Sequence, residues 1–315
     1  MTLSRIVAPS ATGRLSAVGE ISRRRYFFEN ATSYLLIGPA VFLLLALFIV
    51  PTLGVFVIAA TDWQFGARTL SFVGLENFAE LFGDDTFRTS FVNTVVYVII
   101  VVPGTILSGL GIALVIENGR SLRAFYRAVH FVPYMATLAA MAVAWEALLH
   151  PTIGLVNQAL EQVGLPTANW LHDKNTVVPV LAVIGIWQNL GFAMVLFLAG
   201  LKSIPADLYD AAQVDGADGA LDRLFTVTLP LLGPVTMFVV IVTALRAFEV
   251  FDTVAVLTQG GPGQASEVLL HTLYTESFVF LRTGYGAAIT VVFLCLVVSL
   301  TLLQARVMDG RVHYS

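Results

Sequence analysis

The stretch DLYDAAQVDGADGALDRLFTVTLP, from Asp207 to Pro230, places five aspartates within 24 residues of an otherwise apolar chain. Of the 315 residues, 57% are hydrophobic and only 12% are charged, and the mean hydropathy is +0.83. An ordinary soluble domain carries about 25% charged residues. The composition therefore predicts an integral membrane protein, in which the acidic stretch is expected to be a loop outside the bilayer.

Apolar windows of about 20 residues, the length that spans a bilayer as a helix, recur along the chain. Backbone groups in lipid must be satisfied within their own segment, and the ten-residue alternation of barrel strands is absent, so these windows are predicted to be helices. The fold class is thus an all-α membrane protein with six transmembrane helices. The six predicted spans are Tyr34–Ala60, Phe91–Ile116, Ala128–Leu149, Val177–Leu201, Leu231–Leu257 and Gly284–Ala305.

The basic residues predict the orientation of these spans. With a cytoplasmic N-terminus, twelve of the 17 basic residues fall on the inside and four on the outside, and Arg246 remains within the fifth span. This bias satisfies the positive-inside rule and places both termini and the acidic stretch in the cytoplasm. We expect a cytoplasmic leader over residues 1–30, a membrane domain over 31–310 with a cytoplasmic loop at 203–229, and a cytoplasmic tail at 311–315. The leader does not resemble a removable signal peptide, because the apolar segment after it is too long.

The acidic loop has the features of two short helices. Ser203 can cap a helix that has Pro205 in its first turn, and early aspartates suit the positive end of the helix dipole. Gly216 permits a break, and Pro230 marks re-entry into the bilayer. Each predicted helix has a small apolar face, formed by Leu208, Ala211 and Ala212 and by Leu221, Leu224 and Phe225. Such an element either docks onto a partner protein or folds against its own bundle, and the residues alone leave both open.

Two segments carry a resemblance to a known family. The run IPADLYDAAQVDGA, Ile204 to Ala217, followed by LPLL, resembles the EAA loop in the membrane subunits of bacterial binding-protein-dependent ABC importers, whose pattern is I-P-x-x-L-x-E-A-A-x-x-D-G-A and then L-P. The segment VFDTVAVLTQGGPGQASEVL, Val250 to Leu269, is similar to a signature after the fifth helix in the sugar branch of that family. FVGLENF at 72–78 and GYGAA at 284–288 are also similar to that branch, and the ending RVMDGRVHY resembles its glycerol-3-phosphate subgroup.

The resemblance implies a type I ABC importer permease that carries a sugar or sugar derivative inward by alternating access. It implies three kinds of protein partner: a cytoplasmic ATPase dimer, which holds the ATP and Mg²⁺, a second permease subunit, and an extracytoplasmic solute-binding protein. The coupling helices would dock on the ATPase through Asp210, Ala211, Ala212, Asp215, Gly216, Ala217 and Leu221. Asp210 departs from the usual glutamate, and Thr226 stands where a basic residue is frequent.

Other motifs argue against catalysis by this chain. It has no G-x-x-x-x-G-K-[ST] phosphate loop, so the energy of transport is expected to come from a partner. Five histidines and one cysteine show no metal-ligand spacing, and no metal or cofactor is expected on this chain. The alternatives are a secondary carrier, which would show two related halves with broken helices, and a membrane-embedded enzyme, which would need a clustered nucleophile and base.

Polar and ionisable residues at membrane depth are candidates for the substrate path, because their burial in lipid is costly unless they face a cavity or one another. Arg246, Glu249 and Asp252 recur on one face of the predicted fifth helix, and an ion pair between Arg246 and Glu249 is the alternative role. Indole rings can stack on sugars while amides bond to hydroxyls. On this basis the remaining candidates are Trp145, Glu146, Trp187, Gln188 and Asn189.

Overall fold

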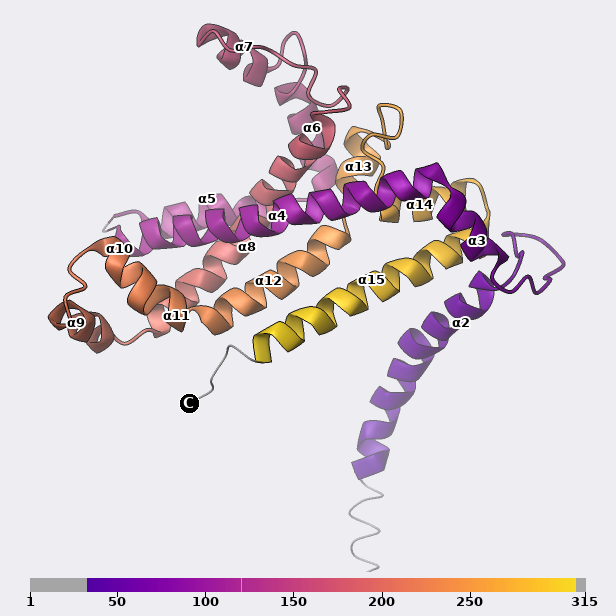
Figure 1. Ribbon diagram of the computed structural model, residues 1–315, viewed down its shortest axis with the longest axis horizontal. Coiled ribbons are helices and arrows are strands. Elements are labelled where there is room, and N and C mark those ends of the chain that lie inside the picture. The colour runs from indigo at the N-terminus through magenta and orange to yellow at the C-terminus, as the bar shows by residue number, and fades with distance from the viewer. Residues whose placement is uncertain (1–32, 120, 310–315) are drawn as a thin grey trace, which may run out of the picture. The chain divides into compact units, whose positions relative to one another are not determined.

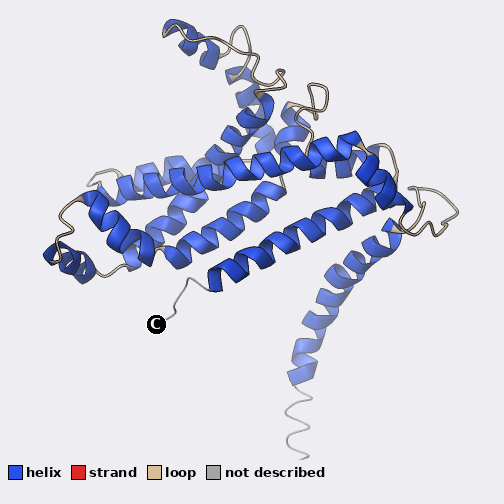
Figure 2. Ribbon diagram, viewed as in Figure 1, coloured by secondary structure: helices blue, strands red, loops and turns tan. Residues whose placement is uncertain are grey.

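The structure is a computed structural model that describes residues 33–119 and 121–309, and these are almost entirely helical (Figure 2). The predicted leader at 1–30 and tail at 311–315 lie outside the described residues. In chain order the elements are η1 (Leu45–Ile49), α2 (Val50–Ala59), α3 (Glu76–Gly83), α4 (Asp85–Asn118), α5 (Arg123–Met135), α6 (Leu138–Leu148), α7 (Leu155–Gln162), α8 (Val177–Ser203), α9 (Ala206–Val214), α10 (Ala220–Arg223), η2 (Leu224–Thr228), α11 (Leu229–Leu231), α12 (Gly233–Phe248), α13 (Asp252–Leu257), α14 (Leu269–Tyr274), η3 (Thr275–Val279) and α15 (Thr283–Asp309).

The chain divides into two units, Met1–Val57 and Ile58–Ser315. In the first, the described residues form a continuous apolar helix that extends through α2 and contains the π-helical turn η1. Its side chains, such as Leu36 and Phe48, are exposed. Exposed apolar side chains on a helix of this length are suited to contact with lipid.

The second unit is built around α4 and α8, which lie side by side, with α5 against α8 and α12 against both α4 and α8 (Figure 1). Glycines allow these helices to approach closely. A Cβ atom placed on Gly109 of α4 would lie 2.7 Å from the Ala193 Cβ of α8, and one placed on Gly191 of α8 would lie 2.1 Å from the His130 carbonyl oxygen of α5. Small residues at contacts of this kind are typical of helix packing in membranes, where apolar burial alone gives no driving force.

Three buried clusters make up most of the core of this unit. Two run along α4, α8 and α12, one around Val101 and Leu181 and the other around Phe197 and Val239. The third, around Ile289, joins α3, α4, α14 and α15.

The predicted spans are confirmed in five places. Helices long and apolar enough to cross a membrane occupy Ser33–Ala59, Asp85–Asn118, Val177–Ser203, Gly233–Leu257 and Thr283–Gln304. The third predicted span, Ala128–Leu149, consists of two helices, α5 and α6, bent by 104°, and it counts as a sixth span if this bent pair crosses the membrane as one. Ala136 and Thr137 have extended backbones and end the first helix. An apolar window predicts that a segment lies in lipid, and it contains no information on whether the segment is straight.

The fifth span also has a break. Helix α12 ends at Phe248, and α13 begins at Asp252 after a short non-helical segment. The expectation that Arg246, Glu249 and Asp252 share one face of a continuous helix is therefore wrong. All three residues nevertheless line one pocket, together with residues of α5 and α8.

The contact at Gly191 gives a test of the packing. In Gly191→Ala the new methyl group would meet the backbone of α5, which must shift, so we expect the free energy of unfolding to fall by about 1–3 kcal/mol. Thermal unfolding of the purified chain in mild detergent measures this change. Gly111→Ala is the matched control, because a Cβ atom at Gly111 has no heavy atom within 4 Å. Equal unfolding midpoints for the two variants would contradict the close approach of α5 and α8.

Candidate functional site

The acidic segment between α8 and α12 forms the predicted pair of short helices, α9 and α10. Gly216 lies between them with φ of +96°, a left-handed conformation that favours glycine. The predicted cap at Ser203 is wrong. The Ser203 hydroxyl donates to the Gly200 carbonyl oxygen at 2.7 Å and so belongs to the end of α8, and Pro205 occupies the N-cap position of α9 without a side-chain cap.

Hydrogen bonds tie this segment to the start of the following helices. The Tyr209 hydroxyl of α9 lies 3.1 Å from the Thr228 hydroxyl of η2, and Thr228 in turn donates to the Arg223 carbonyl oxygen at 3.3 Å. The capping box of α10 closes with a bond from the Gly219 amide to the Asp222 carboxylate at 3.2 Å. The segment is therefore a folded element with its own contacts.

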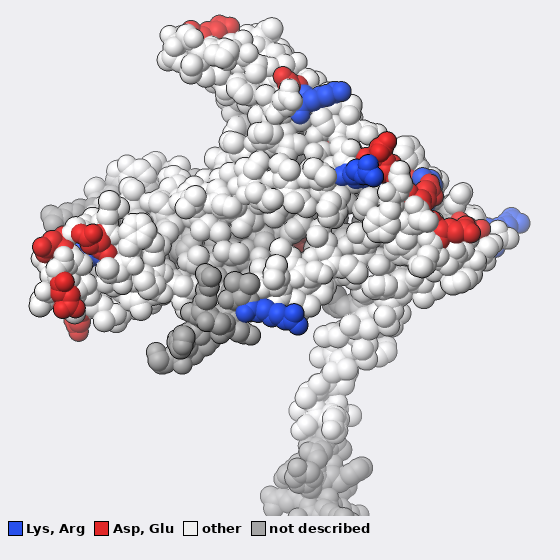
Figure 3. Space-filling model, in the orientation of Figure 1, with Lys and Arg blue, Asp and Glu red and all other residues white. Residues whose placement is uncertain are grey.

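An apolar groove of about 510 Å³ lies on the side of this element that has no lining residue from α4 or α8, its outer side; the side toward the ends of α4 and α8 is its inner side. Most of the predicted docking residues lie in it: Ala211, Ala212, Asp215 and Ala217, together with Leu208. Asp210 is exposed beside the groove, Gly216 supplies the turn, and Leu221 lines a different pocket on the inner side. All five aspartates are exposed, and Figure 3 shows acidic side chains gathered at this end of the second unit.

A polar pocket of about 170 Å³ lies between α4, α5, α8 and the break after α12. It brings together five of the predicted path residues: Gln188, Asn189, Arg246, Glu249 and Asp252. The Asn189 amide nitrogen donates to the Gly185 carbonyl oxygen at 2.8 Å, which leaves its side-chain oxygen as an acceptor. Arg246, Glu249 and Asp252 are exposed in this single chain.

Aromatic rings hold Arg246 in place. The guanidinium carbon lies 4.8 Å from the centroid of the Tyr134 ring and 5.8 Å from that of Phe192, and these two rings stack with centroids 5.1 Å apart. An arginine over an aromatic face is stabilised by the ring quadrupole. Among the described residues Arg246 forms no ion pair, so the pairing with Glu249 considered as an alternative is not observed. The edges of the guanidinium remain available as donors.

The other path candidates lie outside the lining of this pocket. Trp145 and Trp187 meet edge to face, with ring centroids 5.3 Å apart, and Glu146 is exposed on α6. The sequence reasoning missed Tyr97, Tyr134 and Phe192, of which the first two line the pocket. An arginine can be stabilised by an aromatic face, but which ring it meets depends on the packing of α5 and α12 on α8.

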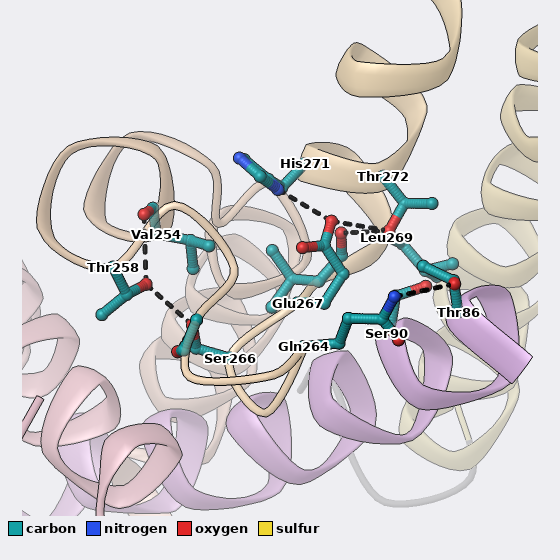
Figure 4. Close-up of polar contacts among 12 residues, drawn as sticks. Thr86, Ser90, Val254, Thr258, Gln264, Ser266, Glu267, Leu269, His271 and Thr272 are labelled. Carbon is teal, nitrogen blue, oxygen red and sulfur yellow. Dashed lines mark hydrogen bonds and ion pairs between the residues drawn. The ribbon is translucent and has the colours of Figure 1, made fainter. Parts of the chain in front are cut away.

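The glycine-rich signature at 250–269 contains α13 and the loop after it, and this loop docks on α4 (Figure 4). The side-chain amide of Asn93 donates to the carbonyl oxygens of Ala265 at 3.0 Å and Glu267 at 2.9 Å. The backbone N–H of Leu269 donates to the Thr94 hydroxyl at 2.9 Å. The buried Glu267 carboxylate accepts bonds from His271 Nδ1 at 2.7 Å and from the Thr272 hydroxyl at 2.9 Å.

Glycine at position 260 is explained by the same carboxylate. Gly260 has φ of +80°, and a Cβ atom there would lie 1.9 Å from Glu267 Oε2. The signature is thus a compact hydrogen-bonded structure that fixes the loop between α13 and α14 against α4.

A cluster of charged residues lies just before α15, where Arg282 pairs with Glu80 of α3 and with Glu276 of η3. Burial raises the pKa of Glu276 above its usual range, and the Arg282 charge opposes this effect. The cluster links α3 to the segment before α15.

Several apolar spans, a folded polar element between two of them and a polar pocket among them together define a multi-pass membrane transport protein. The chain belongs to the family of binding-protein-dependent transport system inner membrane components, whose family model matches residues 91–312. It is the permease component of an ABC importer, a transport subunit rather than an enzyme, and this confirms the resemblance and the fold class expected from the sequence. Nothing in these comparisons supports the carrier or enzyme alternatives.

Relatives match over nearly the whole chain. The probable ABC transporter permease protein YurN of Bacillus subtilis is 34% identical, covering 87% of this chain and 94% of its own. The sn-glycerol-3-phosphate transport system permease protein UgpA of Agrobacterium fabrum is 31% identical, covering 91% and 98%. A bacterial ABC transporter involved in the import of the acidic polysaccharide alginate has the same fold, with a TM-score of 0.79 at 20% identity over 93% of this chain and 100% of that one.

Asn93 gives a test of the docked signature loop. In Asn93→Ala two carbonyl groups lose their donor, so we expect the free energy of unfolding to fall by about 1–3 kcal/mol. We also expect faster proteolysis in the loop between α13 and α14, which limited digestion of the purified chain measures. Asn175→Ala is the control, because the Asn175 side chain is exposed and makes no hydrogen bond among the described residues. Unchanged proteolysis in Asn93→Ala would contradict the docking role.

Proposed function

We propose that this chain is the permease of a bacterial importer for a sugar or sugar derivative, and that it couples ATP hydrolysis on partner subunits to transport through the segment at 203–229. The observation that carries the proposal is the apolar groove on that segment, which Ala211, Ala212, Asp215 and Ala217 line. Small side chains leave room for side chains of a partner, and the exposed aspartates beside them add polar contacts. A cytoplasmic ATPase dimer is the partner that we assign to this groove.

The orientation in the proposal follows from charge. Basic residues are concentrated in the loops on the side of the acidic segment, so this segment and both termini lie in the cytoplasm of a bacterium and the chain spans its inner membrane. ATP and Mg²⁺ belong to the ATPase, and this chain binds no cofactor of its own.

The coupling segment is connected along the chain to two helices that line the polar pocket. The segment follows α8 directly and leads through η2 and α11 into α12. Both α8 and α12 supply residues of the pocket, namely Gln188, Asn189 and Arg246. When the ATPases close, they push on α9 and α10, and the attached helices rock between two states that open the pocket to opposite sides of the membrane.

The polar pocket is the proposed solute contact. Arg246 donates hydrogen bonds, Glu249 and Asp252 accept them from hydroxyl groups, and the amides of Gln188 and Asn189 do both. Trp145, Glu146 and Trp187 are proposed as path residues outside the pocket. Ionisable side chains exposed at membrane depth need a polar environment, which a second permease subunit would complete by covering this face. An extracytoplasmic binding protein delivers the solute, by analogy with the alginate importer solved in complex with an alginate pentasaccharide-bound periplasmic protein.

Two substitutions test the coupling segment. Gly216→Pro cannot adopt the positive φ of this turn, and Asp210→Lys reverses the charge beside the groove. We expect both to abolish uptake and the recovery of the ATPase in a mild-detergent pull-down of the tagged chain, without loss of membrane insertion. Glu161→Lys, which reverses an exposed charge on α7, should recover the ATPase and the second permease normally. Normal transport by Gly216→Pro would refute the coupling role.

Arg246→Gln tests the solute contact. Loss of a charged donor should lower uptake by about 10-fold or more, equivalent to ~1.4 kcal/mol. The measurement is uptake of the solute that wild-type cells accumulate from a panel of labelled saccharides and glycerol 3-phosphate. The ATPase should still copurify with this variant. The control is Arg88→Gln, because Arg88 is exposed and its ion pair with Asp85, at 3.9 Å, is exposed as well. Equal uptake by the two variants would remove Arg246 from the solute path.

A further inference from the structure

A second large pocket, of about 690 Å³, lies on the inner side of the coupling segment. Its walls are the last turns of α4 and α8, Ile204, residues of α9 and α10, and the two ends of η2 at Leu224 and Thr228. It therefore lies where two long apolar helices end and the polar segment begins. In a membrane this is the level of the lipid headgroups.

The pocket contains two cationic side chains with unused hydrogen-bond donors. Lys202 is exposed and has no hydrogen bond or ion pair partner in the described part of the chain. The Arg223 Nε atom is buried and has no hydrogen-bond partner, although Nη2 of the same side chain donates to the Asp218 carbonyl oxygen at 3.2 Å. A buried donor without a partner is unfavourable, so an acceptor that reaches the Arg223 guanidinium would be stabilising.

Negative charge in the pocket is already compensated. Glu117 is its acidic lining residue, and the Arg123 guanidinium lies 3.9 Å from that carboxylate. None of the five aspartates of the coupling segment lines the pocket. The nearest in sequence to Arg223, Asp222, accepts from the Gly219 amide instead. The local charge is therefore positive although the segment as a whole is acidic.

The rest of the lining is apolar, with Leu114, Leu201, Leu221 and Leu224 among its residues. Leu221 is 69% exposed, so its apolar surface is uncovered in this chain. A cavity that combines leucine side chains with two cations, at the boundary of the bilayer, fits a molecule with an anionic head and apolar chains. Basic pockets between spanning helices bind anionic lipid headgroups on the same physical grounds.

We propose that this pocket binds an anionic phospholipid, with Lys202 and Arg223 donating to the phosphate oxygens and the leucines contacting an acyl chain. Free phosphate has the same anionic chemistry, but the leucine lining favours the lipid. A bound lipid would link the coupling segment to the ends of α4 and α8. The inference rests on the proposed function only in placing this segment at the cytoplasmic face.

Native mass spectrometry of the full-length chain, purified in mild detergent, tests the proposal. The chain is titrated with phosphatidylglycerol and with phosphatidylcholine of the same acyl chains. We expect wild type to bind phosphatidylglycerol about 10-fold more tightly, a difference of ~1.4 kcal/mol. The double variant Lys202→Gln/Arg223→Gln should lose this preference. Lys174→Gln, which removes an exposed lysine outside this pocket, should keep it.

Further arms separate the outcomes. Arg223→Lys keeps the charge and should keep most of the preference, and the single variant Lys202→Gln changes only an exposed side chain, so its fold is not at risk. Equal binding of the two lipids by wild type, or an unchanged preference in the double variant, would overturn the proposal. Displacement of phosphatidylglycerol by millimolar inorganic phosphate would show a free-phosphate site and overturn the lipid assignment. Recovery of the ATPase from the same preparations tests the proposed function separately.

Discussion

The close approach of α4, α5 and α8 at glycines is the constraint on which the rest of this structure depends. On α8, Gly185 faces the Tyr97 hydroxyl of α4, where a Cβ atom would lie 2.2 Å from that oxygen, and Gly191 faces the backbone of α5. Gln188 and Asn189 lie between these two contacts. The glycines therefore bring the polar turn of α8 against Tyr97 and Tyr134, and larger side chains there would separate the walls of the pocket.

The pocket and the coupling segment are connected by covalent continuity. One end of the segment is the C-terminus of α8, and its other end enters α12 through η2 and α11, so in the proposed function a displacement of α9 and α10 would act on two walls of the pocket at once. The hydrogen bond between Tyr209 and Thr228 joins α9 to η2 within the segment. The loop after α13 is fixed to α4 through the side chain of Asn93.

The sequence predicts most spans and the coupling segment because both depend on local properties. A long apolar window needs no partner to be recognised, and Gly216 with its flanking aspartates marks a turn wherever the bundle lies. The bend after α5, the break before Asp252 and the ring under Arg246 depend on tertiary packing. Tyr134 is distant from Arg246 in sequence, and the packing of both α5 and α12 on α8 brings them to 4.8 Å. Ser203 was misassigned because a serine between two helices can end one as well as begin the next.

The acidic segment that interrupts this apolar chain has two chemically different sides. Its outer side combines exposed carboxylates with a groove lined by alanines, and its inner side presents Lys202 and Arg223 to a pocket lined by leucines. In the proposed function, the opposite charges on the two sides would favour one orientation of the segment between a protein partner and the bilayer edge. Because Asp210 is one methylene shorter than the glutamate of the family pattern, we expect the partner's donor to reach closer to α9. Charge complementarity then requires basic or hydrogen-bond-donating residues at the rim of the partner's groove.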